Sequence, residues 1–279
     1  MLNKKKFKLF FSILLLFLGM TYLIAEEVDI SRLMPLGDSI TYDNRISDLD
    51  DPRPTSTRTG YRSHLWYSLE GTGKPVDFVG SRVAGQAINP PFDPNNEGHP
   101  GWHSNDIAEK VYSYMLNSQP TSVLLHIGTN DHGTFAGGVD KILNEINLYE
   151  QSSGQSVHVY VALIINRKDD DKIIRLFNDN VKSVVANHII SGDNITLVDM
   201  FNNARLVSSD YADETHPNDN GYKKMANVWF QELIKPYNQQ LSAFPYTISA
   251  AKEIETIHIN ATATSVDFIV NIPNSGIVF

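Results

Sequence analysis

The chain has no cysteine among its 279 residues. This absence excludes disulfide bonds, zinc sites built on thiolates, a cysteine nucleophile and lipid attachment through a cysteine. Folding and any chemistry therefore depend on other side chains.

Closely spaced metal ligands are also lacking. The nine histidines are an ordinary number for this length, and the most suggestive of them are His99, His103, His126 and His132. They raise the alternative of a metal-dependent phosphoesterase, but no compact set of histidines and aspartates of the kind used by a two-metal site is present. The sequence therefore predicts no bound metal and no cofactor.

Positive charge is scarce in most of the chain. The formal net charge is −9, and four lysines lie in the first 25 residues, so that removing their four charges leaves −13 for the remainder. Such an acidic body repels nucleic acids and anionic membranes. We expect a neutral or small substrate and no nucleic-acid partner; the sequence carries no signature of an oligomeric state.

Residues 1–25 have the layout of a secretory signal peptide. A lysine cluster is followed by an apolar stretch and by Ala25, which suits the last position before cleavage. Leu23 is large where a small residue is usual, so an uncleaved membrane anchor is the alternative. The stretch is short for a membrane span of about 20 residues. The expected localisation is secreted or periplasmic, and membrane-anchored if the leader is uncleaved.

Apolar runs and helical patterns alternate after the leader. The pattern predicts strands at residues 28–36, 76–79, 122–127, 157–165 and 195–199, and helices at residues 61–69, 104–116, 139–149, 172–190 and 218–233. Ser104 or Asn105 is the expected N-cap of the second helix. This order predicts a three-layer α/β domain with a mostly parallel sheet, whose ligand site lies beyond the carboxyl ends of the strands.

Three segments depart from the alternation. Residues 41–58 and 84–100 are rich in Asp, Asn, Pro and Gly and are predicted to be long loops. From residue 245 onward the apolar residues alternate as in β-strands, over a length too short for an independent domain. The expected division is a signal peptide at 1–25, the main domain at 26–240, and a β-rich extension at 241–279.

Two polar clusters follow predicted strands. Ser39, in the segment MPLGDSIT, follows the first strand, and Asn130 follows the strand SVLLHI, so both are expected at the same rim of the sheet. Ser39 can cap a helix or act as a nucleophile. Asn130 can donate a hydrogen bond to a developing oxyanion or simply form a turn.

The segment DETHP precedes the last predicted helix. Asp213 lies three residues before His216 and can bind the imidazole Nδ1, which leaves Nε2 as a base. The structural alternative is that both residues cap a turn, with Pro217 at the first helical position.

The long loop after the second strand contains EGHPGW at residues 97–102. A glycine there allows a backbone N–H to approach a ligand closely. The alternative is a tight turn around Pro100 and Gly101.

Four segments together resemble the GDSL, or SGNH, hydrolase family. They are GDSI (37–40), GHPG (98–101), GTND (128–131) and DETH (213–216), in that order on the expected βα positions, and the resemblance covers roughly residues 33–233. Flanking sequences are similar to the branch that contains carbohydrate esterases, including acetyl xylan esterases: GYR (60–62), VDFVGS (76–81), EGHPGW (97–102) and HPNDNGY (216–222). The resemblance implies a three-layer α/β/α sandwich around a mostly parallel, flavodoxin-like, five-stranded sheet.

The resemblance also implies a role for each matching residue. Ser39 corresponds to the nucleophile, His216 to the general base and later acid, and Asp213 to the residue that orients His216. The oxyanion hole would consist of the backbone N–H groups of Ser39 and Gly101 and the side-chain amide of Asn130, with Gly98 as the alternative glycine. The G-x-S-x-G elbow of α/β-hydrolases is absent because position 41 is Thr.

The sequence departs from the family pattern around the nucleophile. GDSL is GDSI here, and Tyr42 and Asp43 replace a glycine often found shortly after it. These changes concern the shape of the substrate pocket more than the chemistry. Substrate contacts are expected from Trp102, Arg62, Tyr42 and the loop 166–170.

The leading functional hypothesis is a secreted serine esterase that removes O-acetyl or similar short acyl groups from carbohydrate. The alternatives are a lipase or lysophospholipase acting on other acyl esters, and a non-catalytic carbohydrate-binding surface protein. The loops lack the long apolar run that a lipase would present.

Overall fold

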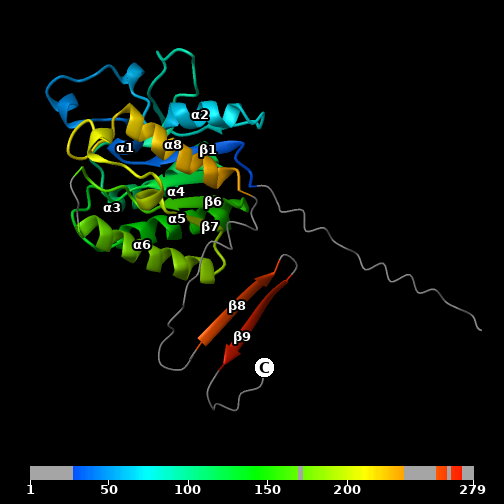
Figure 1. The fold of residues 1–279 in the computed structure, drawn as a ribbon. Coiled ribbons are helices and arrows are strands. Elements are labelled where there is room, and N and C mark those ends of the chain that lie inside the picture. The colour runs from blue at the N-terminus through cyan, green and yellow to red at the C-terminus, as the bar shows by residue number, and fades with distance from the viewer. Residues whose placement is uncertain (1–27, 169–171, 236–255, 263–264, 272–279) are drawn as a thin grey trace, which may run out of the picture.

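A computed structural model of the chain describes residues 28–168, 172–235, 256–262 and 265–271 (Figure 1). The predicted signal peptide lies outside the described residues. Within them, no helix combines the length and the apolar character needed to cross a membrane.

The described body contains one large, mostly parallel sheet. Its strands are β1 (Arg32–Gly37), β2 (Asp77–Phe78), β3 (Arg82–Val83), β4 (Asn95–Gly98), β5 (Ser122–His126), β6 (His158–Ala162) and β7 (Ile195–Val198). The order is β3-β4-β1-β5-β6-β7, with β2 also paired to β1, and only β3 and β4 pair in antiparallel fashion. The predicted sheet type is confirmed, with two short strands beyond the five expected.

Helices cover both faces of this sheet (Figure 1). On one side lie α2 (Arg62–Glu70) and α8 (Asp219–Leu233); on the other lie α3 (Ser104–Ala108), α4 (Val111–Ser118), α5 (Gly137–Ser153) and α6 (Lys172–Ile190). Neighbouring strand residues point to opposite faces. Accordingly Leu33 belongs to the core under α2 and α8, whereas Met34 belongs to the core under the other four helices. The three-layer fold is therefore confirmed.

The helix predicted at 104–116 is two helices in the structure. The chain leaves helical geometry at Lys110, where φ is −121°, before α4 begins. The expected cap at Ser104 or Asn105 is wrong. His103 occupies the N-cap position, and the backbone N–H and hydroxyl of Ser104 instead donate to the carboxylate of Asp131.

The alternating pattern near the end of the sequence corresponds to β8 (Thr256–Thr262) and β9 (Ser265–Asn271), which pair antiparallel. Strands were predicted in this region. That residues 241–279 form an extension and not an independent domain stays a prediction.

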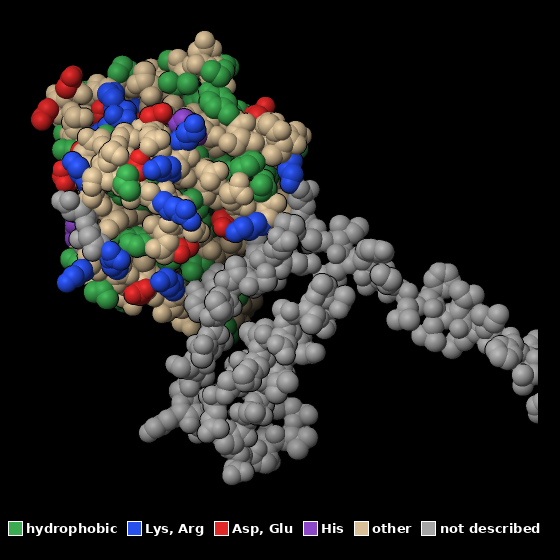
Figure 2. Space-filling model, viewed as in Figure 1, with side chains coloured by type: hydrophobic (Ala, Val, Ile, Leu, Met, Phe, Trp, Pro, Cys, Tyr) green, Lys and Arg blue, Asp and Glu red, His purple; other side chains and the backbone are tan. Residues whose placement is uncertain are grey.

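Charged side chains of both signs are scattered over the face of the body shown in Figure 2. Lys and Arg side chains are spread among Asp and Glu over this face and do not gather into one broad patch.

The strand register brings three loops to one point on the rim. Gly37, the last residue of β1, pairs with Gly98 of β4 on one side and with His126 of β5 on the other. A Cβ atom at Gly37 would lie 2.2 Å from the carbonyl oxygen of His126, so only glycine fits. The segments that follow these three residues therefore leave the sheet side by side.

Candidate active site

Ser39 begins a short helix at the end of β1. This helix, α1 (Ser39–Tyr42), has Asp38 as its N-cap, and the Asp38 carboxylate accepts the N–H of Ile40 at 2.9 Å. The capping role therefore belongs to Asp38 and leaves the Ser39 hydroxyl available. The free N–H groups of a helix start also favour negative charge.

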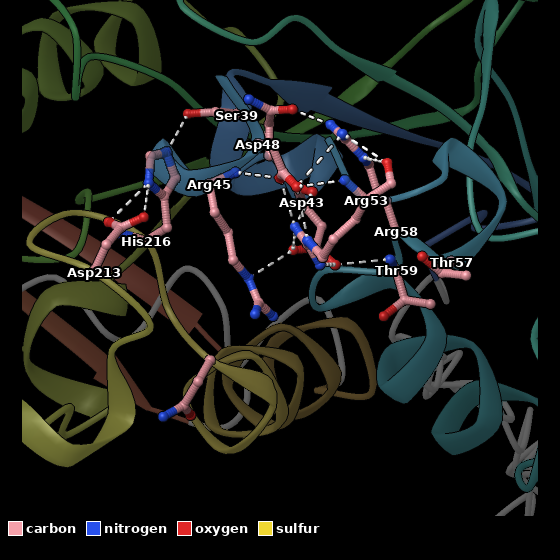
Figure 3. Close-up of polar contacts among 12 residues, drawn as sticks. Ser39, Asp43, Arg45, Asp48, Arg53, Thr57, Arg58, Thr59, Asp213 and His216 are labelled. Atoms are coloured by element: carbon pink, nitrogen blue, oxygen red, sulfur yellow. Dashed lines mark hydrogen bonds and ion pairs between the residues drawn. The ribbon is translucent and has the colours of Figure 1, made fainter. Parts of the chain in front are cut away.

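Ser39, His216 and Asp213 form a connected chain of hydrogen bonds (Figure 3). Oγ of Ser39 lies 2.8 Å from Nε2 of His216. On the opposite side of the ring, Nδ1 of His216 lies 3.0 Å from both carboxylate oxygens of Asp213. This is the arrangement in which a carboxylate fixes the imidazole tautomer and leaves Nε2 to accept the serine proton.

Asp213 is anchored by backbone donors. Its oxygens accept the N–H groups of Thr215 and His216, each at 2.8 Å, and of Ile46 at 2.9 Å. Burial raises the pKa of this carboxyl. The three N–H groups and the neighbouring imidazole together lower the pKa by more, so that it lies below its ordinary value. Asp213 is therefore ionised at neutral pH.

The capping alternative for DETHP holds for Asp213 and fails for Pro217. α8 begins at Asp219, and its N-cap is Asn218, whose side-chain oxygen accepts the N–H of Gly221. Pro217 therefore precedes the helix and does not occupy its first position. The Asp213 carboxylate caps the turn through the N–H groups of Thr215 and His216 and also binds Nδ1 of His216.

The structure distinguishes the two candidate oxyanion glycines. The N–H of Gly98 already donates to the side chain of Asn96 at 3.0 Å, and a Cβ at Gly98 would lie 2.7 Å from the backbone nitrogen of Tyr42. Gly101 is exposed, with φ at +80° and nothing near its Cβ direction. Within the described residues its N–H donates no hydrogen bond. The geometry therefore favours Gly101 as the ligand-facing donor.

Asn130 is joined to the same loop. Its Nδ2 donates to the carbonyl oxygen of Trp102 at 2.9 Å. A side-chain amide carries two N–H groups, so the second remains for a ligand. The next residue, Asp131, binds Ser104 and ties the loop after β5 to the start of α3.

An aromatic stack supports the Gly101 loop. The half-buried ring of Trp102 stacks on His99 with centroids 4.1 Å apart, and Tyr114 stacks on His99 at 5.2 Å. His99 also contacts the buried carboxylate of Glu97 at 2.7 Å. Trp102 follows the candidate oxyanion glycine directly, and one face of its ring is occupied by His99. A substrate contact at Trp102 stays a prediction.

One expected substrate contact, Arg62, is corrected by the structure. Arg62 is completely buried and donates to backbone carbonyl oxygens inside the fold, those of Thr41, Tyr42, Arg58, Ala84 and Pro94. Tyr42 is also largely buried, with the guanidinium of Arg82 4.5 Å from its ring centre. The Arg62 side chain therefore supports the loops and does not line the surface, whereas a substrate contact at Tyr42 stays a prediction. Of the loop 166–170, the last two residues lie outside the described part.

Sequence reasoning missed an ion-pair cluster beside the nucleophile (Figure 3). In the loop after α1, the guanidinium of Arg53 contacts Asp43 at 3.1 Å and Asp48 at 2.9 Å. Both carboxylates are buried, and Asp43 adopts a left-handed backbone with φ at 68°. The mixture of aspartates and arginines in the predicted loop was the available signal. This cluster holds in place the loop that contains Ile46, whose backbone N–H donates to Asp213.

No group of three or more metal-binding side chains occurs in the described residues. One of the histidines that suggested a metal site, His126, has a structural role in the core. Its ring is fully buried, Nε2 accepts the N–H of Ile165, and burial lowers its pKa to about 4. It therefore serves as a neutral core residue.

The family model for the GDSL-like lipase/acylhydrolases matches residues 33–229. The chain belongs to this family. The match spans β1 through most of α8 and so contains the hydrogen-bonded chain Ser39, His216 and Asp213.

Similar proteins include several esterases. A multidomain esterase of Ruminococcus flavefaciens is 26% identical over 232 residues, which are 72% of this chain and 28% of that protein. The chain thus spans less than a third of that relative. Among solved structures, an acetyl esterase mutant with an acetate ion is 26% identical with a TM-score of 0.62, covering 75% of this chain and 98% of the other.

A family 3 carbohydrate esterase from Talaromyces cellulolyticus gives the same identity and score, 26% and 0.62, and covers 76% of this chain and 99% of the other. These findings confirm the resemblance to the GDSL family and its carbohydrate-esterase branch. They support a carboxylic ester hydrolase, which is the predicted enzyme class.

Proposed function

We propose that this GDSL-family chain hydrolyses short acyl esters, in particular O-acetyl groups on carbohydrate, through an acyl-enzyme on Ser39. The observation that carries the proposal is the 2.8 Å contact between Oγ of Ser39 and Nε2 of a histidine whose other nitrogen is bound by Asp213. A serine hydroxyl becomes nucleophilic when a positioned base removes its proton.

The first half-reaction forms the acyl-enzyme. Oγ of Ser39 attacks the ester carbonyl carbon while Nε2 of His216 takes the hydroxyl proton. The tetrahedral intermediate then expels the sugar oxygen, which takes that proton from His216 and leaves as a hydroxyl. Asp213 remains ionised and stabilises the imidazolium.

The second half-reaction releases the acid. Water gives a proton to Nε2 of His216 and attacks the acyl carbon, and the collapse of the second tetrahedral intermediate returns the proton to Ser39. In both steps the negative oxygen would accept hydrogen bonds from the N–H groups of Ser39 and Gly101 and from the Asn130 amide. Removing one such donor typically costs about 10²–10³ in rate.

A carbohydrate ester is supported by three features. The body is acidic, which suits a neutral glycan better than a polyanion. Trp102 lies beside Gly101 and can present its remaining face to a sugar ring. The relatives include a family 3 carbohydrate esterase and an acetyl esterase, at an identity of 26% in each case.

One structural feature favours a second substrate class, esters of longer acyl chains. Ile46 and Leu49, in the 3-10 helix Ile46–Leu49 beside the triad, are 47% and 78% exposed. The backbone of Ile46 binds Asp213, so this apolar edge adjoins the site. It could contact an acyl chain better than a sugar.

The mechanism is tested with Ser39→Ala on a chromogenic acetate ester. We expect a loss of about 10⁴-fold or more in kcat with unchanged thermal unfolding, because a triad nucleophile is removed. Residual activity above about a hundredth of the wild type would contradict the mechanism. Labelling of the wild type, but not of the variant, by a serine-reactive phosphonate is the matched control.

The substrate class is tested by measuring acetate release from acetylated xylan alongside a series of esters with increasing acyl length. Highest kcat/KM for acetate supports the carbohydrate deacetylase; rates that rise with chain length support the lipase alternative. Glycan binding without turnover of any ester would instead support a non-catalytic surface protein.

We also propose that the protein is exported, with residues 1–25 as the leader, and that it acts on a small or carbohydrate ester without nucleic-acid partners. The lysine cluster and apolar stretch of the leader support export. Sequencing the N-terminus of the protein recovered from the culture medium and from membranes distinguishes cleavage after Ala25 from an uncleaved anchor.

A further inference from the structure

A second pair of an acidic residue and a histidine lies at the end of β4. Glu97 is 0% exposed and His99 is 5% exposed. The two residues stand two positions apart at the end of an extended segment, so their side chains leave the backbone on the same side. Nε2 of His99 lies 2.7 Å from Oε1 of Glu97, and it is the donor because a carboxylate only accepts hydrogen bonds. The proposed mechanism gives neither residue a role.

Glu97 is held in place by the neighbouring strand. The backbone N–H of Ser81, the residue before β3, donates to Oε2 of Glu97 at 2.6 Å, and the Ser81 hydroxyl donates to Oε1 at 2.7 Å. β3 itself pairs with β4 through Arg82 and Asn96. A buried carboxylate is tolerated when donors satisfy its oxygens, and His99 supplies the third of them. Glu97 is therefore a fixed point to which the His99 ring is tied.

The His99 ring is also held by aromatic stacking. The ring planes of Trp102 and Tyr114 are inclined to it by only 21° and 12°. The backbone N–H of His99 donates to the carbonyl oxygen of Gly37, two residues before the nucleophile, at 2.8 Å. Ring and backbone of His99 are thus both fixed, the ring by β4 and α4 and the backbone by β1.

A tight turn begins at His99 and presents Gly101. The N–H of Trp102 donates to the carbonyl oxygen of His99 at 3.1 Å, and the φ angle of Gly101 is +80°. Pro100 cannot adopt a positive φ. A turn with proline second and a positive φ at the third residue is of type II. A type I turn would rotate the peptide between Pro100 and Gly101 by about half a turn, so the turn type decides where the Gly101 N–H points.

The same turn holds the other side-chain donor of the candidate oxyanion hole. The carbonyl oxygen of Trp102 accepts Nδ2 of Asn130 at 2.9 Å. A displacement of His99 would therefore change the position of the Gly101 N–H and of the Asn130 amide together, relative to Ser39. Misplacement of a catalytic group by about 1 Å can lower a rate by about 10²-fold.

We propose that Glu97 and His99 are positioning residues for the oxyanion hole. Their hydrogen bond fixes the turn 99–102, so that the Gly101 N–H and the Asn130 amide point to the same oxygen. Neither residue touches the substrate. Their effect is confined to the transition state, because the oxyanion exists only there. This inference rests on the proposed function, because the oxyanion hole belongs to that mechanism.

The discriminating variants are His99→Gln and His99→Asn. Both remove the ring and its stacking. The glutamine amide nitrogen can take the place of Nε2 and donate to Glu97, whereas the shorter asparagine does not reach the carboxylate. We expect kcat to fall about threefold in His99→Gln and about thirtyfold or more in His99→Asn, with KM within about twofold of the wild type in both.

His99→Phe makes the opposite change, because it keeps a flat ring and removes the donor. Its kcat should resemble that of His99→Asn and not that of His99→Gln. The matched control is His158→Phe. His158 is also buried, bonds to the Thr196 hydroxyl through Nε2 at 2.7 Å and stacks on Tyr160 at 4.4 Å. It begins β6, at the end of the sheet opposite the site, so His158→Phe should lower the free energy of unfolding and keep kcat per folded molecule within about twofold.

An alkylboronic acid provides a readout that needs no turnover. Its tetrahedral adduct with Ser39 carries a negative charge at the position of the oxyanion, so its affinity should fall in parallel with kcat across the His99 variants.

The proposal is overturned if folded His99→Phe and His99→Asn keep kcat within about twofold, if the loss appears in KM instead, or if His158→Phe lowers kcat as much. The comparison of His99→Gln with His99→Asn decides if His99→Phe does not fold. Ser39→Ala tests the mechanism without reference to His99, so the proposed function and this inference can fail separately.

Discussion

The backbone N–H of Ile46 donates to Oδ2 of Asp213 at 2.9 Å, although 167 residues separate them in the chain. The bond joins the loop that follows the nucleophile to the loop that carries the base. Asp213 thus orients His216 and also fastens the first loop of the site to the last.

Ile46→Pro tests this bond, since proline has no N–H. Ile46 starts a 3-10 helix after the extended residue Arg45, a position where the proline ring can be accommodated. We expect kcat to fall about threefold to tenfold, because the carboxylate that orients His216 loses one of its three backbone donors. Ile46→Ala keeps the N–H and serves as control; an equal kcat for the two variants would contradict the role of the bond.

Arg62→Lys should reduce stability and leave substrate affinity nearly unchanged. A lysine ammonium cannot reproduce the planar guanidinium that reaches carbonyls on both long loops, and the buried oxygens would lose their donors. We expect the free energy of unfolding to fall by about 2–4 kcal/mol. Denaturant unfolding and KM measured on the folded fraction check this. A large rise in KM at unchanged stability would return Arg62 to the substrate site.

Gly98→Ala and Gly101→Ala should have different consequences. At Gly98 the new Cβ would collide with the backbone of Tyr42, which should lower the free energy of unfolding by about 1–3 kcal/mol. At Gly101 there is room, and the left-handed backbone adds strain of about 1–2 kcal/mol at the donor loop. Gly101→Ala should therefore reduce kcat more than Gly98→Ala does, when both rates are expressed per folded molecule. The reverse order would make Gly98 the oxyanion donor.

Acid should destabilise the protein through the carboxylates around the site. Burial raises the pKa of Asp48, but the guanidinium and N–H of Arg53 and the N–H of Arg45 lower it well below its ordinary value. A depressed folded-state pKa means that the stabilisation is present above the unfolded-state pKa and is lost as the pH falls toward the folded-state value. The free energy of unfolding should thus fall steadily below about pH 4, less steeply in Asp48→Asn. Denaturant titrations at a series of pH values measure this slope.

Asp38 should show the opposite sign. Burial raises its folded-state pKa from the ordinary 3.8 to about 7, so the folded state binds the proton more tightly than the unfolded chain does. Its favourable contribution is complete below the unfolded-state pKa and is lost as the pH rises through about 7. Between about pH 4 and pH 7, Asp38→Asn should therefore lose less stability with rising pH than the wild type does, and above about pH 7 the two curves should run parallel. A wild-type curve parallel to that of the variant between about pH 4 and pH 7 would contradict a raised pKa.

Periodicity was sufficient to predict the main sheet and its covering helices. The continuous apolar run at β5 and the amphipathic repeat of α6 are strong local signals, and both elements appear where they were expected. β4 was missed because its sequence, Asn-Asn-Glu-Gly, has no apolar alternation. It becomes a strand only through pairing with β1, a contact made by residues far away in the chain.

The candidate site was predictable to a similar degree. The order of the motifs predicted that Ser39, Asn130, Asp213 and His216 lie at one rim. In the structure, hydrogen bonds join Ser39 to His216 and His216 to Asp213. Arg62 was misjudged because a charged residue beside the first loop looks like a surface ligand. Its burial depends on carbonyl oxygens from both long loops, at residues 41–58 and 84–94, and no local sequence pattern indicates those contacts.

Because Gly37 at the end of β1 pairs with two strands, enzymatic activity should appear only when those strands have assembled. Gly37 touches β4 and β5 at once, so the nucleophile, the Gly101 loop and the Asn130 loop take their relative positions only when all three strands have docked in register. A partly assembled sheet would contain each motif intact and still lack a working site. During refolding, enzymatic activity should therefore return with the final docking of the sheet and not with the earlier formation of its helices.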